Sequence, residues 1–462
     1  MKTLKKITSV VVALSMVMAL ITVTPTKTEA AVKIIVGKKL TMNYGKTDQI
    51  MVKGTGVKAT SSNKKIAKVT KVKKAGKNTI ITVKGVKSGK ATIKVKKGSS
   101  SKKVKVTVNP AKVTIVDAAR TSLADATCNS IKVTWKKAKG ATGYYVYYST
   151  NATSGFKSVK IKGGSKTSTI VSGLTNGAKY YFKVKAYGNN STKSSSYSSV
   201  KAEKTYKLTW SDEFNYTDTN KLSTNWTYEE GHGEKYGNPG WGNNELQYYT
   251  TGDNVKLNGT NLVIIPKYTT NNVAEKYTST IMVSRGKKSF KYGRIEFRAK
   301  LPKGQGTWAA CWMLGSSNKW PLCGEIDVLE TTKDITKTTI PQSIHCNRFN
   351  GMPTSTGNKF KHTTVSTATS AYHTYGIEWD EQVIKFYIDG KYTWTYDPDV
   401  YSAIADGNSN VDIWPYNQPF YLILNCAIGG TLGGSVGSQY WTSVGNNTYE
   451  DYMYVDYVRV YQ

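Results

Sequence analysis

Apolar and polar residues alternate along most of this chain with a period of two. Residues 91–95 and 104–108 are clear cases, since every second position is Ala, Ile or Val and the intervening positions are Lys or Thr. Such alternation is typical of strands buried on one face. Gly-Lys and Asn-Gly pairs separate the runs as turns. No long run with a 3.6-residue period follows residue 30, so the pattern predicts an all-β chain of sandwiches.

The 462 residues are enough for two to four domains. Shifts in composition predict three modules after an N-terminal segment, over residues 32–109, 111–205 and 207–462. Of the 11 tryptophans, all but Trp135 lie in the third module. We expect two small β-sandwiches followed by one larger sandwich.

The first 30 residues resemble a secretory signal peptide. Lys2, Lys5 and Lys6 precede a mostly apolar run over residues 10–23, and small residues follow at 28–31. The run is too short for a convincing membrane span, although an uncleaved signal anchor is the alternative. No second apolar run of spanning length exists. We therefore expect a secreted protein without a membrane span after signal cleavage.

Five cysteines are too few and too odd in number to define a disulfide framework. Cys311 and Cys323 flank a predicted hairpin and could pair, but free buried thiols fit their apolar surroundings equally well. No CxxC spacing and only four His occur, so neither a zinc site nor metal-centred catalysis is indicated.

The net charge of +35 belongs to the first two modules. Residues 31–110 carry 22 Lys and one acid, Asp48, and residues 111–206 carry 16 basic and 3 acidic residues. Lys dominates over Arg, the first module lacks interleaved aromatics, and the chain is expected to be exported, so nucleic acid is not the predicted partner. An anionic cell-wall polymer is the favoured partner, with cell-wall association as a consequence. A Lys-rich surface that serves only solubility is the alternative.

The candidate chemistry lies in the segment GEIDVLE, residues 324–330. Glu325 and Asp327 share one face of a regular strand, whereas Glu330 would lie on the other. A β-bulge near Val328 and Leu329 would bring all three carboxylates to one face. Two neighbouring acids, one ionised and one protonated, are what a retaining glycosidase uses. Trp308, Trp312 and Trp320 flank the segment and are candidates for stacking on sugar rings.

The third module resembles the catalytic domain of glycoside hydrolase family 16, in its laminarinase (endo-β-1,3-glucanase) branch. The resemblance is collinear and rests on WSDEF at 210–214, WGNNELQYYT at 241–250, YGRIE at 292–296, AKLP at 299–302, WAACWML at 308–314, GEIDVLE at 324–330, HTYGIEW at 373–379, FYIDG at 386–390, LILN at 422–425 and VDYVRVY at 455–461. It implies a curved jelly-roll sandwich with the glycan cleft on its concave face.

The same resemblance implies the residue roles. Glu325 would be the nucleophile, Glu330 the general acid and base, and Asp327 the residue that orders the nucleophile. Asn244, Arg285 and His345 match substrate-binding positions of laminarinases. The resemblance implies no cofactor for catalysis. It does imply a structural Ca²⁺ held by Glu213, the backbone oxygen of Gly259 and Asp456, which are oxygen ligands suited to a hard cation.

The first two modules resemble other families. Residues 59–63 (ATSSN), 66–69 (IAKV) and 85–93 (GVKSGKATI) resemble a bacterial Ig-like group 2 domain. The second module resembles a fibronectin type III domain in its Trp135 and in Leu174 followed by Tyr180. Both resemblances imply Ig-like β-sandwiches.

These observations predict a secreted, monomeric, retaining endo-β-1,3-glucanase that acts on a β-glucan polysaccharide. A hydrolase of mixed-linkage glucan, or an agarase- or carrageenase-like galactan hydrolase of the same family, is the alternative. A non-catalytic glycan-binding protein is a third reading. Proteins of that type lack one or both glutamates, whereas Glu325 and Glu330 are both present.

Overall fold

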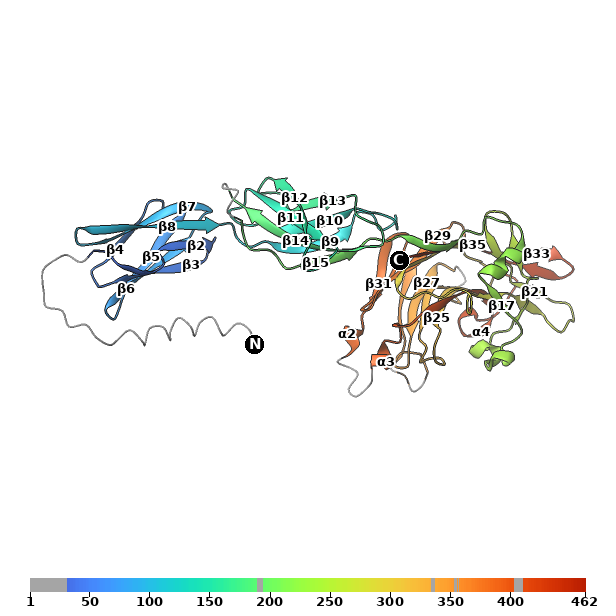
Figure 1. The fold of residues 1–462 in the computed structure, drawn as a ribbon. Helices are drawn as coiled ribbons and strands as arrows, with labels where there is room; N and C mark the ends of the chain where they lie inside the picture. Colours follow the sequence, from blue (N-terminus) through green and yellow to red (C-terminus); the bar gives the residue numbers. More distant parts are fainter. Residues whose placement is uncertain (1–30, 189–193, 334–336, 353–354, 356, 403–409) are drawn as a thin grey trace.

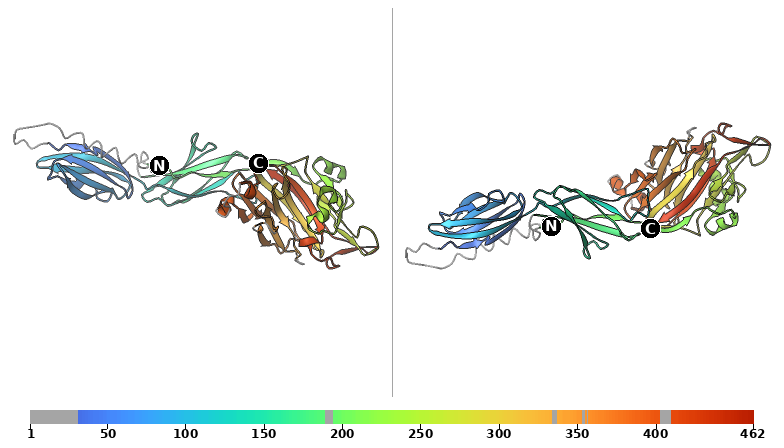
Figure 2. Two further views of the ribbon diagram at one scale, coloured as in Figure 1. Left: turned by 90° about the horizontal axis from the view of Figure 1, so that it is seen from below. Right: turned by 90° about the horizontal axis from the view of Figure 1, so that it is seen from above.

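The structure is a computed structural model that describes residues 31–188, 194–333, 337–352, 355, 357–402 and 410–462. The expected signal peptide, residues 1–30, lies outside the described residues and stays a prediction. The described part of the chain is built almost entirely of strands, so the all-β prediction is confirmed. Three strand-rich bodies follow one another in a row, with the second between the other two (Figures 1 and 2).

The first body is a sandwich of two four-stranded sheets, ordered β1-β3-β6-β5 and β2-β8-β7-β4. The alternation seen in the sequence becomes alternation of burial, and the inward side chains form one core that includes Ile81, Ile93 and Val106. Its strands are β1 (Ile34–Val36), β2 (Lys39–Asn43), β3 (Thr47–Lys53), β4 (Lys58–Ser61), β5 (Ala67–Ala75), β6 (Asn78–Gly85), β7 (Gly89–Lys97) and β8 (Ser100–Asn109).

The second body is a sandwich of a three-stranded sheet, β13-β10-β9, and a four-stranded sheet, β12-β11-β14-β15. Trp135 is buried in its core beside Tyr144. The Tyr180 hydroxyl accepts a hydrogen bond from the backbone N–H of Thr175, which is the local corner expected from Leu174 and Tyr180. Its strands are β9 (Thr114–Arg120), β10 (Ile131–Lys136), β11 (Gly143–Ser149), β12 (Lys157–Lys162), β13 (Ser168–Val171), β14 (Lys179–Tyr187) and β15 (Lys201–Lys204).

The third body packs a large sheet ordered β19-β20-β35-β24-β29-β30-β31, to which β16 adds by pairing with β35, against a seven-stranded sheet. The order of the seven-stranded sheet is β17-β23-β32-β25-β26-β27-β28, and a smaller sheet, β18-β22-β21-β34-β33, lies beside these two. The first large sheet contains β16 (Leu208–Asp212), β19 (Val255–Leu257), β20 (Leu262–Ile264), β24 (Gly293–Lys300), β29 (His373–Trp379), β30 (Ile384–Ile388), β31 (Lys391–Tyr396) and β35 (Met453–Tyr461).

The seven-stranded sheet contains β17 (Thr227–Glu229), β23 (Ile281–Val283), β25 (Thr307–Gly315), β26 (Glu325–Glu330), β27 (Thr339–His345), β28 (Lys359–Thr364) and β32 (Phe420–Ile428). The smaller sheet contains β18 (Tyr248–Tyr249), β21 (Lys267–Thr269), β22 (Tyr277–Ser279), β33 (Thr442–Gly445) and β34 (Thr448–Glu450). Short helical turns occur at η1 (Thr219–Thr224), η2 (Glu234–Tyr236), η3 (Pro239–Gly242), α2 (Pro398–Ser402), α3 (Asn410–Ile413) and α4 (Gly430–Gly433).

One hydrophobic core fills the space between the two large sheets. Phe297, Tyr375 and Val458 enter it from one sheet, and Met313 and Leu424 enter it from the other. A smaller hydrophobic cluster, which includes Ile281, Tyr421 and Ile423, lies on the outer face of the seven-stranded sheet. The five cysteines, Cys128, Cys311, Cys323, Cys346 and Cys426, are all buried free thiols, so the alternative of a Cys311–Cys323 disulfide is wrong in this structure.

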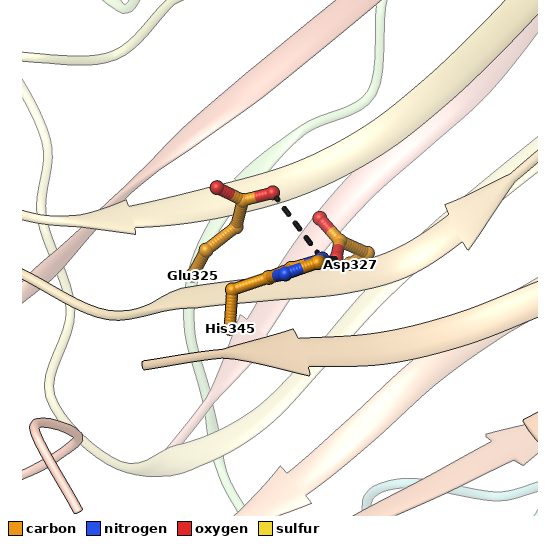
Figure 3. A group of neighbouring side chains, drawn as sticks. All are labelled: Glu325, Asp327 and His345. Carbon is orange, nitrogen blue, oxygen red and sulfur yellow. Dashed lines mark ion pairs between the residues drawn. The ribbon is translucent and has the colours of Figure 1, made fainter. Parts of the chain in front are cut away.

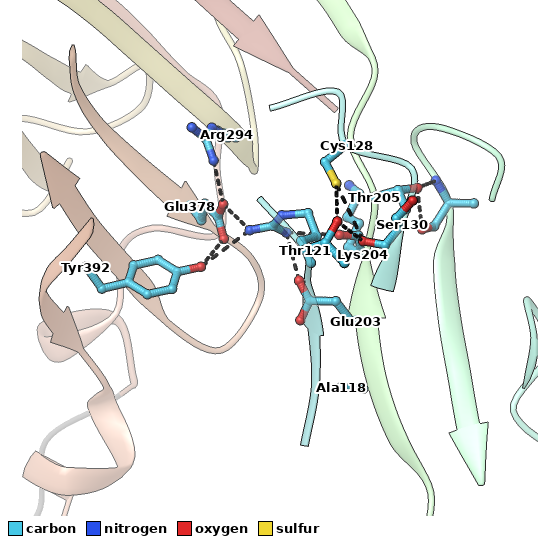
Figure 4. A network of polar contacts seen from close by, with 12 residues as sticks. Ala118, Thr121, Cys128, Ser130, Glu203, Lys204, Thr205, Arg294, Glu378 and Tyr392 are labelled. Carbon is cyan, nitrogen blue, oxygen red and sulfur yellow. Dashed lines mark hydrogen bonds and ion pairs between the residues drawn. The ribbon is translucent and has the colours of Figure 1, made fainter. Parts of the chain in front are cut away.

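The second and third bodies share a buried polar contact that the sequence pattern does not predict. Arg120 of β9 donates hydrogen bonds to Glu203 and to Glu378 of β29, and Arg294 and Tyr392 also donate to Glu378 (Figure 4). The Arg120 side chain is 3% exposed and that of Glu378 is 7% exposed. An apolar group of Ala126, Tyr206 and Tyr461 lies in the same junction.

Candidate active site

An open cleft of about 660 Å³ lies on the outer face of the seven-stranded sheet. Five of the seven strands supply side chains to it, with Glu229 from β17 and Ile281 from β23 at one edge. On the central strand β25, Trp308, Ala310, Trp312 and Leu314 line the cleft, whereas Ala309, Cys311 and Met313 enter the core. The two-residue period therefore places one set of side chains in the cleft and the other in the core.

Strand β26 carries the acidic triplet along the cleft floor. Its register with β25 shifts between Leu329, opposite Cys311, and Asp327, opposite Trp312, so Val328 is the extra residue of a β-bulge. Val328 and Leu329 are both fully buried in the core. Since two consecutive side chains point inward, Glu330 returns to the face of Glu325 and Asp327, and all three acids line the cleft. The bulge predicted from the spacing is confirmed.

Gly324 fixes the start of this strand. Its φ of +76° lies in the left-handed region, and an added Cβ would come within 2.7 Å of the Pro415 ring. A larger residue would displace the backbone immediately before Glu325.

Each acid of the triplet accepts a hydrogen bond from a neighbouring side chain. The Trp320 indole N–H donates to Glu325 Oε2 at 2.8 Å, and the Ser343 hydroxyl donates to Asp327 Oδ2 at 2.6 Å. The Trp308 indole N–H donates to Glu330 Oε1 at 3.2 Å.

His345, on the neighbouring strand β27, lies directly opposite Glu325 in the register. Its Nε2 is 3.3 Å from Asp327 Oδ2 and 3.9 Å from Glu325 Oε1. Figure 3 shows the imidazole extending alongside both carboxylates, with its tip beside Asp327. The site is therefore a row of three acids with one basic side chain beside the first two.

Comparisons with known proteins identify the families of the second and third bodies. Residues 234–404 match the family model for glycosyl hydrolases family 16, and residues 118–201 match the fibronectin type III domain. The chain is 36% identical over 268 residues to a β-glucanase of Rhodothermus marinus, which covers 56% of this chain and 85% of the relative. The chain belongs to glycosyl hydrolase family 16.

Two further similarities lie in the same region of this family 16 hydrolase. A glucan endo-1,3-β-glucosidase A1 of Niallia circulans is 35% identical over 270 residues, which cover 55% of this chain and 38% of that protein. The crystal structure of a laminarinase from Flavobacterium sp. UMI-01 is 36% identical, covers 55% of this chain and 100% of that one, and gives a TM-score of 0.47.

The surroundings of Glu325 and Glu330 in the family 16 site favour the protonated forms of these two side chains. Burial, and next the Asp327 carboxylate, raise the pKa of Glu325 well above its usual range, while His345 opposes the rise. The same two causes raise the pKa of Glu330 to about 8. Burial alone would lower the pKa of His345, but Glu325 and Asp327 raise it to about 10, so the imidazole is protonated near neutral pH.

The neighbours of the two glutamates differ in a way that separates their roles. Glu325 receives the short Trp320 hydrogen bond and faces the imidazolium of His345. Glu330 receives longer hydrogen bonds, from Trp308 at 3.2 Å and Ser343 at 3.4 Å. The short hydrogen bond and the nearby imidazolium favour the ionised form of Glu325, against burial, which raises the pKa of both glutamates.

Three donor atoms of Glu325, Asp327 and His345 lie within 4.8 Å of one another, the separation that a metal site would need. A protonated imidazole has no lone pair to offer a cation. Metal binding at this group would therefore require His345 to lose its proton.

Most of the predicted substrate-binding residues line the cleft. These are Trp308, Trp312, Trp320 and Arg285. The Trp312 indole N–H donates a hydrogen bond to Asn425 Oδ1 at 2.8 Å. Trp320 is 43% exposed at the rim of the cleft. Arg285 pairs with Glu229 and lies over the Tyr421 ring at 5.5 Å.

Asn244 is not among the residues that line the cleft. It has a φ of +57° and an exposed side chain, in a turn where Trp241 also has a positive φ. The side chains that line the cleft from this segment are those of Trp241, Asn243 and Glu245. Burial raises the pKa of Glu245 to about 7, against hydrogen bonds from Gln247, Asn243 and Tyr249. These residues lie inside the WGNNELQYYT segment. The two-residue period of a strand does not predict which side chains of a turn face a cleft.

The predicted calcium ligands lie near one edge of the other large sheet. Asp212 pairs with Val458, so Glu213 follows β16 beside β35, which carries Asp456. Each carboxylate already has a guanidinium partner: Arg459 donates two hydrogen bonds to Glu213, and Arg298 pairs with Asp456. The oxygen donors suit Ca²⁺ only if these arginines move, so the calcium site stays a prediction.

Among the described residues, no helix is long and apolar enough to cross a membrane.

Proposed function

We propose that this family 16 hydrolase is a retaining endo-β-1,3-glucanase that works outside the cell. The observation that carries the proposal is the bulged strand β26, which aligns Glu325, Asp327 and Glu330 along the floor of an open cleft. The relatives named β-glucanase and glucan endo-1,3-β-glucosidase support a β-glucan substrate. The open cleft lets an internal part of a polymer bind, which an endo-acting enzyme requires.

The proposed reaction is a double displacement. Glu325, whose charge is stabilised by Trp320 and His345, attacks the anomeric carbon while Glu330 donates its proton to the departing glycosidic oxygen. A covalent glycosyl–enzyme intermediate forms on Glu325. Glu330, now ionised, removes a proton from water as the water attacks the same carbon and releases Glu325. Asp327, which accepts a hydrogen bond from Ser343, lies between them on the strand and orders the nucleophile.

Side chains of the cleft would hold the sugar rings. Trp312 and Trp320 offer apolar faces for stacking, and Arg285, Asn243 and Glu245 offer polar groups for hydroxyls. The small side chain of Ala310, which pairs with Glu330 in the register, leaves room above the floor for a ring.

The test is release of reducing sugar from laminarin, lichenan, barley β-glucan and agarose by the protein without residues 1–30. The proposal predicts strong release from laminarin that is lost in Glu325→Gln and in Glu330→Gln. Release only from another polymer would contradict the β-1,3 specificity. Full activity of either variant would contradict the roles of the acids.

Export, the monomeric state and the structural Ca²⁺ are further parts of the proposal. Export is measured by finding the processed chain in the culture medium of a host that carries residues 1–462. A calcium site predicts a higher melting temperature in Ca²⁺ than in EDTA. Equal melting temperatures would indicate that Arg298 and Arg459 already compensate Glu213 and Asp456.

A further inference from the structure

One face of the second body carries tyrosines and lysines in alternate, facing positions. On the sheet β12-β11-β14-β15, Tyr145 lies opposite Lys185 and Lys160, and Tyr147 lies opposite Lys183. The residues between them, such as Val146 and Val184, point into the core. We call the outward set, together with Tyr197, the tyrosine–lysine face.

Aromatic rings hold the ammonium groups of this face in place. Lys183 Nζ and Lys185 Nζ lie 4.6 and 4.7 Å from the centre of the Tyr197 ring. The rings of Tyr197 and Tyr147 form a T-shaped pair with their centres 5.1 Å apart. Lys160 Nζ lies 5.9 Å from the centre of the Tyr145 ring. Cation–π contacts restrict side chains that are otherwise very flexible, so less entropy is lost when an anion binds.

No acidic side chain among the described residues pairs with these three lysines. The three acids of the second body are used elsewhere: Glu203 pairs with Arg120, Asp117 accepts from the backbone of Ala118, and Asp125 accepts from Thr127. Lys183 and Lys185 therefore hold two like charges around one ring without compensation. An anion bound between them would relieve this repulsion.

We propose that the tyrosine–lysine face binds an acidic polysaccharide, with carboxylates of sugar acids at Lys160, Lys183 and Lys185 and a sugar ring against Tyr197. Tyr197 is 40% exposed and offers an aromatic surface to such a ring. The face carries lysines and no arginine, whereas recognition of phosphate in nucleic acids favours the arginine fork. This binding does not depend on the proposed glucanase activity.

The test is binding of residues 31–462 to polygalacturonate, measured by affinity electrophoresis at low salt. Lys183→Gln with Lys185→Gln should weaken binding about three- to thirty-fold, which corresponds to the usual range for two exposed ion pairs. The matched control is Lys71→Gln with Lys73→Gln, which removes the same charge from exposed positions of β5 in the first body. The control should change binding less than about twofold.

Polyglutamate carries negative charge but no sugar. Binding to it therefore separates the stacking contribution of Tyr197 from the attraction between charges. Tyr197→Ala should weaken binding to polygalacturonate and leave binding to polyglutamate nearly unchanged. If the Lys183/Lys185 variant and the Lys71/Lys73 control lose the same affinity for polygalacturonate, net charge alone binds the polymer and the proposal is overturned. Absence of binding to polygalacturonate, or equal binding of polyglutamate, would overturn it as well. Circular dichroism and an unchanged melting temperature would show that the variants remain folded.

Discussion

At the scale of single residues, His345 opposes the rise in the pKa of Glu325 and Glu330. It lies 3.3 Å from Asp327 and 3.9 Å from Glu325, and its pKa is raised to about 10 by the acids it faces. An imidazolium in this position favours the ionised form of both glutamates. Positive charge beside Glu325, the proposed nucleophile, is thus supplied by a side chain of the neighbouring strand.

His345→Gln should move the pH profile of kcat/KM to higher pH. Loss of the cation raises the pKa of Glu325, so activity on the acid side is lost at a higher pH. It also raises the pKa of Glu330 from about 8, so the general acid stays protonated to higher pH on the alkaline side. Initial rates on laminarin between pH 4 and 10 measure both limbs of the profile. His362→Gln on the exposed surface of β28 is the control, and an acid limb that stays in place in His345→Gln would refute this role.

Glu330→Gln should lower kcat by about 10²–10⁴-fold, the usual contribution of a general acid. The loss should be much smaller for an aryl glycoside whose leaving group needs no proton. Comparing the variant on laminarin and on such an aryl glycoside measures this difference. Equal losses on both substrates would indicate that Glu330 does not protonate the leaving group.

At the scale of the elements, strand β25 sets the shape of the cleft through its alternating side chains. Ala310→Leu would place a branched side chain opposite Glu330, where the proposed sugar ring lies. Its expected effect is a fall in kcat/KM of about 10²-fold, because a small displacement of the substrate disturbs its alignment with the acids. The melting temperature should change little, since the added atoms enter the cleft and not the core. Kinetics and thermal melting together test this, and unchanged kcat/KM would contradict the proposed position of the substrate.

The same elements show what could be predicted from the sequence. The bulge in β26 was predictable because three carboxylates with an odd spacing fit one face only if a residue is added. The two-residue period of strand β25 likewise predicts that Trp308, Ala310, Trp312 and Leu314 lie on one face. The turn around Trp241 was not predictable in detail, because positive φ angles at Gly240, Trp241 and Asn244 break any fixed period. The family resemblance points to Asn244, whereas Asn243 and Glu245 line the cleft.

At the scale of the whole molecule, the catalytic body and the second body are joined by a buried ion-pair network. Arg120 and Glu378 are 258 residues apart in the chain, and no local pattern indicates that they meet. Burial alone would raise the pKa of Glu378, but the Arg120 guanidinium holds it below its usual range. The carboxylate of Glu378 is thus kept ionised by a residue of the neighbouring body.

Arg120→Met should lower the free energy of unfolding by about 3 kcal/mol, because it removes one partner of a buried charge pair. Lys179→Gln is the matched control, since Lys179 and Glu381 form an exposed pair at 3.8 Å across the same junction. The control should cost less than about 1 kcal/mol. Urea unfolding of residues 31–462 measures both variants, and equal effects would show that the Arg120 network does not stabilise the junction.

The stereochemistry of hydrolysis tests the central proposal most directly. Proton NMR of laminari-oligosaccharides during the first minutes of hydrolysis shows the anomeric form of each new reducing end. The account predicts that the β anomer appears first and converts later to the α anomer, and that Glu325→Gln yields neither. Initial appearance of the α anomer would contradict the assignment of Glu325 as a nucleophile on the bulged strand.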